Sequence, residues 1–195
     1  DPSYEPNFIK EEKMGGIFFF VYILLGAIPL LLYGSVPGPM SLLADVGYIL
    51  AGVFMLINKK NIVACIGFGI LALQGFLQFV NGILQFSYYV NPLSAMFFKL
   101  LGFAGYMLLF LCAVIQFTDF MPELKKIAAM LWFVPIVFLG LAALHTIASL
   151  IPILFAGGLA PALINILRNV VRLAGLACAG WWIGITETSG KRPEF

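Results

Sequence analysis

The sequence predicts an all-α membrane protein: a bundle of six transmembrane helices joined by short loops, with both termini in the cytoplasm. Apolar residues make up 62% of the 195-residue chain and charged residues only 10%. A soluble domain of this length has too little core to bury so much apolar surface. Six long apolar runs are each sufficient to cross a hydrocarbon core of about 30 Å, whereas a β-barrel would show short segments of alternating polarity.

Turn-forming and charged residues separate the apolar runs and set the expected helix ends. The first run stops at GSVPGPM, the second at NKKN, the third at YVNP, the fourth at TDFMPELKK and the fifth at AGGL. Pro and Gly favour turns, and charged side chains favour water, so these stretches are expected outside the bilayer. We therefore expect helices at 16–33, 41–57, 62–88, 93–117, 127–155 and 160–186.

The first apolar run is interpreted as a transmembrane helix. It is too long for the apolar region of a signal peptide, and no small-x-small cleavage site follows it. The chain then divides into a cytoplasmic N-terminal segment (1–14), a six-helix transmembrane domain (15–186) and a cytoplasmic C-terminal tail (187–195).

The basic residues predict the orientation. Eight of them fall on one side of a six-helix arrangement: Lys10, Lys13, Lys59, Lys60, Lys125, Lys126, Lys191 and Arg192. The connections on the other side contain neither Lys nor Arg. The positive-inside rule therefore places both termini in the cytoplasm of a multi-pass protein, which we expect in the plasma (cytoplasmic) membrane.

Four charged residues lie inside the expected spans: Asp45, Lys99, Arg168 and Arg172. An ionisable group within the bilayer costs about 2.5 to 3.5 kcal/mol even on the lenient insertion scale, so each needs compensation. At about 1.5 Å per residue, Arg172 lies about 18 Å down the last helix, near the membrane midplane. The other three lie nearer the outer surface, so all four lie in the outer half of the membrane or at its midplane.

The third helix carries a row of carboxamides in the stretch QGFLQFVNGILQF. Gln74, Gln78, Asn81 and Gln85 follow one another at spacings of 4, 3 and 4 residues, so they share one helical face. They climb from mid-membrane to the outer surface, at the depth of the intramembrane charges.

The last two helices add polar groups at the same depth. Asn165, Arg168, Asn169 and Arg172 share one face of the sixth helix, and His145 and Ser149 lie one turn apart on the fifth. Toward the cytoplasm the same stripes carry small residues, namely Gly67, Gly175 and Ala179, which let helices approach closely. The pattern predicts a pocket that is open outward and closed inward.

The charges in this pocket favour an anion. Three cations face one carboxylate, and Arg can grip a carboxylate or phosphate bidentately while carboxamides orient the rest of a polar molecule. The expected ligand site comprises Arg168, Arg172, Gln74, Gln78, Asn81, Asn165, Asn169, His145, Lys99 and Asp45. The function expected is a solute-binding or transport component that captures an anionic or zwitterionic small molecule, or a lipid headgroup, from the outer side.

Two other classes stay open. Carboxamides can serve as hydrogen-bonded contacts between helices, worth about 0.6 to 2 kcal/mol each, and Asp45 can simply neutralise a cation. The protein would then be a structural or regulatory subunit whose polar faces meet partner helices or lipid headgroups. In the second alternative, His145 and Asp45 act as an acid–base pair of an intramembrane enzyme on a lipid.

The sequence lacks the residues expected of a serine hydrolase, a metal site or a nucleic-acid-binding protein. There is no G-x-S-x-G nucleophile motif, and the spans supply one His and one Asp, too few for a metal site. The cysteines Cys65, Cys112 and Cys178 are scattered without metal-ligand spacing, and they map to the reducing half of the membrane. We expect no metal, no cofactor and, because the basic residues come in separated pairs, no nucleic-acid partner.

Overall fold

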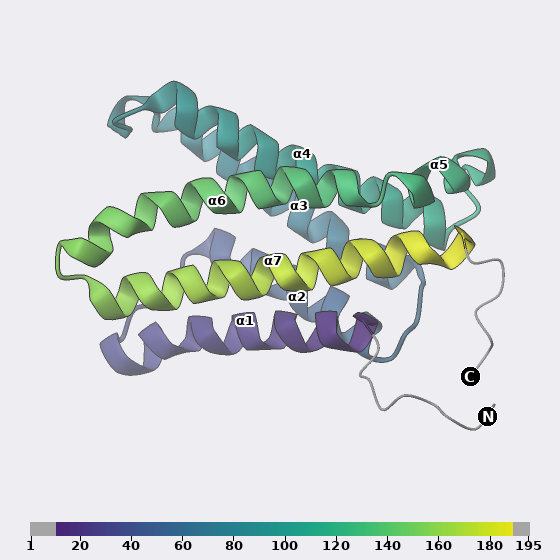
Figure 1. Cartoon of the computed structure of the whole chain (residues 1–195), viewed down its shortest axis with the longest axis horizontal. Helices are drawn as coiled ribbons and strands as arrows, with labels where there is room; N and C mark the ends of the chain where they lie inside the picture. Colours follow the sequence, from purple (N-terminus) through teal and green to yellow (C-terminus); the bar gives the residue numbers. More distant parts are fainter. Residues whose placement is uncertain (1–10, 189–195) are drawn as a thin grey trace.

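The computed structural model is all-helical (Figure 1). It describes residues 11–188, and the side chains of residues 13–184. This part of the chain contains seven α-helices and no strand. The helices are α1 (Glu11–Tyr33), α2 (Pro39–Leu56), α3 (Ile62–Leu84), α4 (Pro92–Phe117), α5 (Lys125–Met130), α6 (Phe133–Phe155) and α7 (Leu159–Thr188).

Six of these helices, all except α5, are long and apolar enough to cross a membrane. The predicted helical class is therefore confirmed, together with six helices that are long and apolar enough to span a membrane. The helices also reach beyond the expected transmembrane domain at both ends, because α1 begins at Glu11 and α7 continues to Thr188. The remainder of the two expected terminal segments, 1–10 and 189–195, lies outside the described residues.

Two expected helices differ from the structure. The third ends at Leu84, and Phe86–Tyr88 follow as a 3-10 turn, η1, a form that chains often take at helix ends. The fifth is broken into α5 and α6 at Leu131 and Trp132. Pro135 explains this break, because its ring would clash with the carbonyl of Leu131 four residues earlier, whereas a first helical turn accepts proline.

The six long helices form a closed ring. Each packs chiefly against its neighbours in the order α1, α2, α3, α4, α6 and α7, and α7 returns to pack against α1. Short connections make successive long helices antiparallel, so α1 begins and α7 ends at the same end of the bundle (Figure 1). We call this end, which carries Lys59, Lys60, Lys125 and Lys126, the basic end, and the opposite one the far end.

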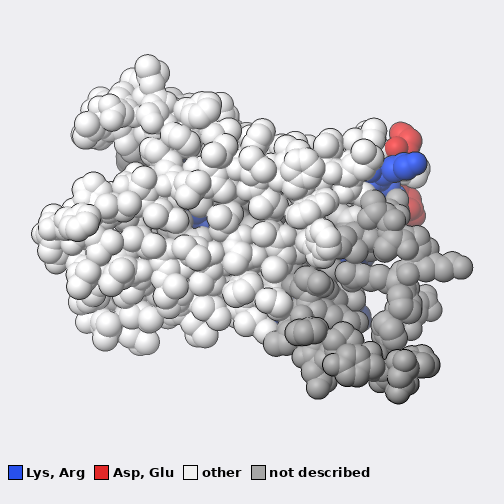
Figure 2. All heavy atoms as spheres, in the orientation of Figure 1, with Lys and Arg blue, Asp and Glu red and all other residues white. Residues whose placement is uncertain are grey.

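Charge is distributed unevenly along the bundle. Figure 2 shows acidic and basic side chains gathered at the basic end near α5, whereas the rest of the visible face is almost uncharged apart from a small basic area between helices. In this region Lys125 Nζ forms an ion pair with Asp119 at 3.3 Å. The short α5 lies against α7 and α4 at this end.

The basic half of the bundle is closely packed, as the small residues predict. A Cβ on Gly67 would lie 2.9 Å from the backbone nitrogen of Ala51, so α2 and α3 touch through their backbones. A Cβ on Gly175 would lie 2.6 Å from the ring of Phe19, which is itself fully buried. Ala179 is also fully buried. The helices α1, α2, α3 and α7 therefore pack closely below the level of Arg172, whereas apolar hollows of about 400 and 220 Å³ lie beside α4 in this half.

Candidate functional site

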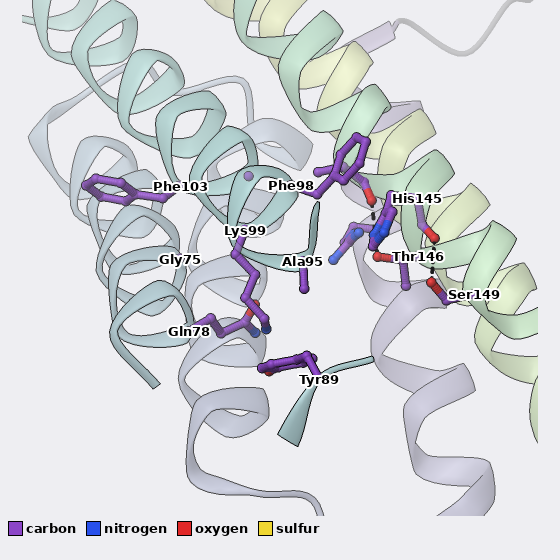
Figure 3. Close-up of a pocket in the computed structure, with 13 residues that line it drawn as sticks. Gly75, Gln78, Tyr89, Ala95, Phe98, Lys99, Phe103, His145, Thr146 and Ser149 are labelled. Carbon is purple, nitrogen blue, oxygen red and sulfur yellow. Dashed lines mark hydrogen bonds between the residues drawn. The ribbon is translucent and has the colours of Figure 1, made fainter. Parts of the chain in front are cut away.

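A cavity of about 410 Å³ lies between α3, α4, α6 and α7 in the far half of the bundle (Figure 3). Its volume falls within the range of about 300 to 1,000 Å³ that is usual for small-molecule sites. The polar residues that line it are Gln78, Tyr89, Lys99, His145, Thr146, Ser149 and Arg172. Aromatic rings and small residues complete the wall: Phe98, Phe103, Gly75, Ala95, Gly102 and Ala142.

Four of the ten residues expected to bind a ligand meet in this cavity. Gln78 comes from α3, Lys99 from α4, His145 from α6 and Arg172 from α7. Because these helices are neighbours around one side of the ring, groups far apart in the sequence face the same space. The cavity thus contains two cations, an imidazole and a carboxamide.

The other six expected residues lie outside the lining of this cavity: Gln74, Asn81, Asp45, Arg168, Asn165 and Asn169. Gln74 is 3% exposed, and its Oε1 is buried without a hydrogen-bond partner. Asn81 is half-buried on α3, and Asn165 is exposed on α7. Asp45 is half-buried on α2 with its Oδ1 likewise unpartnered, so it does not share the cavity with His145.

Arg172 is the most deeply placed cation in the cavity wall. Its Nη2 donates to Asn169 Oδ1 at 2.8 Å, and Asn169 Nδ2 in turn donates to the carbonyl of Asn165 at 2.8 Å. Two members of the expected ligand set therefore hold the arginine, which then lines the cavity. The guanidinium also contacts Tyr48, whose hydroxyl shares a 2.6 Å hydrogen bond with the hydroxyl of Tyr106.

No acidic side chain neutralises Arg172 at close range. Among the side chains that the structure describes, the one ion pair within 4.0 Å is Lys125–Asp119 at the basic end. Arg172 Nε is buried and has no hydrogen-bond partner in the protein. The positive charge of this cavity-lining arginine thus has no carboxylate partner among the described side chains.

Arg168 has different surroundings although it lies one turn from Arg172. Its guanidinium carbon is 4.2 Å from the centre of the Tyr22 ring, and its Nε donates to the Tyr22 carbonyl at 3.2 Å. It occupies the space beside Gly26, where a Cβ would collide with the guanidinium. Asp45 is its electrostatic counterpart, at more than the 4.0 Å of a direct ion pair. Arg168 thus joins α7 to α1 and has a carboxylate nearby.

The side chain of Lys99 lies in the space that Gly82 of α3 leaves open. A Cβ on Gly82 would lie 2.7 Å from Lys99 Cδ, so the glycine leaves room for the stem of the lysine. The ammonium group lies 5.8 Å from the centre of the Tyr89 ring, and Figure 3 shows the side chain reaching toward Gln78 and Tyr89.

The opposite wall of the cavity comes from α6. The His145 ring stacks on Phe98 of α4, with ring centroids 4.1 Å apart and an angle of 12° between the planes. Thr146 Oγ1 donates to the Ala142 carbonyl at 3.1 Å, and Ser149 Oγ donates to the His145 carbonyl at 2.9 Å. These hydroxyls keep their protons within α6 and offer lone pairs to the cavity.

Sequence reasoning missed the aromatic residues of the site. Tyr22, Tyr48 and Tyr106 surround the two arginines, and Tyr89 lines the cavity. A signal existed for the first three, because tyrosines concentrate at membrane interfaces and these lie within apolar runs. A buried tyrosine hydroxyl needs a polar partner, and each of the three lies close to an arginine.

The described residues contain no group of three or more His, Cys, Asp or Glu side chains that could hold a metal ion. Comparison with protein-family models, curated proteins and solved structures finds no match to this chain. The function is therefore argued from the cavity itself.

Proposed function

We propose that the protein is a membrane solute-binding or transport component that captures an anionic or zwitterionic small molecule, or a lipid headgroup, in the cavity between α3, α4, α6 and α7. The observation that carries this proposal is Arg172: a guanidinium in the wall of a cavity, with a buried Nε that has no partner and no carboxylate within ion-pair distance. An anionic ligand would supply the missing negative charge beside the guanidinium.

The charge balance of the cavity supports an anion. Lys99 and Arg172 both line it, and no Asp or Glu is among the described residues that do so. Asp45 and Arg168 offset each other on the α1 and α2 side. A charge within the bilayer costs about 2.5 to 3.5 kcal/mol. Two cations without counter-charges are therefore costly unless an anionic ligand neutralises them.

The expected orientation gives the cavity its sidedness. If the basic end faces the cytoplasm, as the positive-inside rule predicts, the cavity lies in the outer half of the membrane. The close packing around Gly67 and Gly175 then separates it from the cytoplasm. The protein would receive its ligand from the outer side, and delivery across the membrane would require a conformational change or another chain.

The test compares two arginines on the same helix. Wild type, Arg172→Gln and Arg168→Gln are purified in detergent, and the small molecules released from equal amounts of folded protein are identified by mass spectrometry. We expect an anion in wild type and Arg168→Gln and its loss in Arg172→Gln, because removing a desolvated charge partner costs about 2 to 5 kcal/mol of binding. The same anion content in all three proteins would contradict the proposal.

A further inference from the structure

The cavity has a side opening between α4 and α6. These helices touch closely where a Cβ on Gly105 would lie 2.7 Å from Leu139 Cγ. About one turn nearer the far end, a Cβ on Gly102 would lie 3.7 Å from the Cβ of Ala142, which is ordinary contact. Beyond this point the helices diverge, as Figure 1 shows, and the cavity occupies the space between them.

Tyr89 partly covers the end of the cavity that faces the far end of the bundle. Tyr89 follows the η1 turn between α3 and α4, and its ring lies across the end of the cavity beneath Lys99 (Figure 3). On the side between α4 and α6, the Phe98–His145 stack is the one ring contact that bridges the two helices among the described residues.

The rim of the side opening suits lipid. Phe97 on α4, next to the lining residue Phe98, is 56% exposed. The exposed hydroxyls of Thr146 and Ser149 are satisfied within their own helix, which is how hydroxyls are accommodated in a membrane. An alkyl chain could leave the cavity here and continue into the hydrocarbon core.

The head of such a molecule can be inferred from charge. Lys99 and Arg172 together carry two positive charges, and a phosphomonoester carries about −1.5 to −2 at neutral pH, whereas a carboxylate carries only −1. Three phosphate oxygens can also accept from the carboxamide of Gln78 and from the guanidinium of Arg172, both of which line the cavity. A phosphomonoester therefore matches the cavity better than a carboxylate.

We infer that the ligand is an amphiphilic phosphomonoester, which enters from the lipid phase between α4 and α6 and leaves its alkyl chain in that opening. This inference rests on the proposed function and names its substrate class. The head is held by Lys99 and Arg172, and the chain passes Phe98 and Thr146.

Three probes separate the head from the chain and the lipid from a free anion. Thermal unfolding in a maltoside detergent is followed with oleoyl lysophosphatidate (head and chain), glycerol 3-phosphate (head only) and monooleoylglycerol (chain only). Each methylene removed from water strengthens binding about fourfold. If only four methylenes of the oleoyl chain are buried in the opening, lysophosphatidate should bind more than about a hundredfold tighter than glycerol 3-phosphate. We expect no shift with monooleoylglycerol and no lysophosphatidate shift in Arg172→Gln.

A plug at the opening tests the route. Thr146→Trp fills the gap between α4 and α6, and Leu144→Trp places the same side chain on α6 away from the cavity lining. We expect Thr146→Trp to weaken lysophosphatidate at least about tenfold and Leu144→Trp to leave it unchanged. Equal binding in the two variants would overturn the side entrance.

The outcomes also distinguish this inference from the proposed function. If glycerol 3-phosphate binds as tightly as lysophosphatidate and depends on Arg172, the lipid inference falls and the anion site stands. If lysophosphatidate binds equally well to wild type and Arg172→Gln, or if neither phosphate shifts unfolding, the inference falls. Equal anion content in the released-ligand comparison would remove the proposed function independently.

Discussion

Arg168 and Tyr22 join the first and last helices of the bundle, with the guanidinium 4.2 Å from the ring centre and a 3.2 Å hydrogen bond from Nε to the tyrosine carbonyl. This contact closes the ring of helices between residues 146 positions apart in the chain. Arg168 also has the carboxylate of Asp45 as its electrostatic counterpart, whereas Arg172, one turn away, contacts Tyr48 and has no carboxylate within ion-pair distance. The two arginines should therefore respond in opposite ways to the same substitution.

Replacing Arg168 by Gln should destabilise the protein. The change removes a cation–π contact and a charge-assisted hydrogen bond, each worth about 1 to 2 kcal/mol when partly desolvated. Thermal unfolding of ligand-stripped protein in detergent measures the loss. Arg168→Lys serves as the control that keeps the charge, and we expect only partial rescue because an ammonium group lacks the planar fork. An unchanged melting temperature in Arg168→Gln would show that the α1–α7 contact contributes nothing.

Packing in the basic half gives a second prediction. Gly175→Ala should destabilise the protein by about 1 to 3 kcal/mol, because the new methyl group would lie 2.6 Å from the buried ring of Phe19. Gly140→Ala is the matched control, since its Cβ would meet only Leu173 at 3.9 Å. Melting temperatures of the two variants should differ clearly. Equal values would mean that α1 can move away from α7 at little cost.

The sidedness of the bundle can be tested by labelling. We expect single cysteines at Ser35 and Ser87, both exposed at the far end, to react with an impermeant thiol reagent added outside intact cells. A cysteine at Lys59, exposed at the basic end, should react only after permeabilisation. The background carries Cys65→Ala, Cys112→Ala and Cys178→Ala so that only the new thiol is labelled. The reverse pattern would place the cavity on the cytoplasmic side.

The sequence predicted the positions of the helices along the chain better than it predicted which helices pack together. Apolar run length and the Pro, Gly and Lys breaks predicted all six spans, because crossing a bilayer imposes a minimum length on each helix. The break before α6 was missed although Pro135 marks it. A proline within an apolar run forbids the backbone hydrogen bond to Leu131 but does not reveal whether the helix kinks or stops there.

The candidate site was predicted only in part for a related reason. Helical spacing showed that Arg168 and Arg172 share a face of α7, but it could not show which helices meet that face. In the structure α1 packs on one side of it and the cavity opens on the other, so Arg168 contacts Tyr22 while Arg172 lines the cavity. Gln74 and Gln78 diverge in the same way, because one is buried and the other lines the cavity.

Asp45 should couple to Arg168 and not to Arg172. Its carboxylate is the electrostatic counterpart of Arg168, whereas no carboxylate pairs with Arg172 among the described side chains. In ligand-stripped protein, Arg172→Gln should leave stability the same or raise it, because an unneutralised charge leaves the bilayer. Arg168→Gln should lower it and leave Asp45 without its counter-charge.

Double-mutant cycles with Asp45→Asn measure this difference. We expect Asp45→Asn to offset part of the loss caused by Arg168→Gln, and to add independently to the effect of Arg172→Gln. Melting curves are recorded for wild type, for Asp45→Asn, for each arginine variant alone and for each arginine variant combined with Asp45→Asn. Together they give both coupling energies under one condition. If Arg172→Gln is instead strongly destabilising and Asp45→Asn rescues it, Arg172 is part of a structural ion pair. The cavity would then have no spare positive charge to offer an anion.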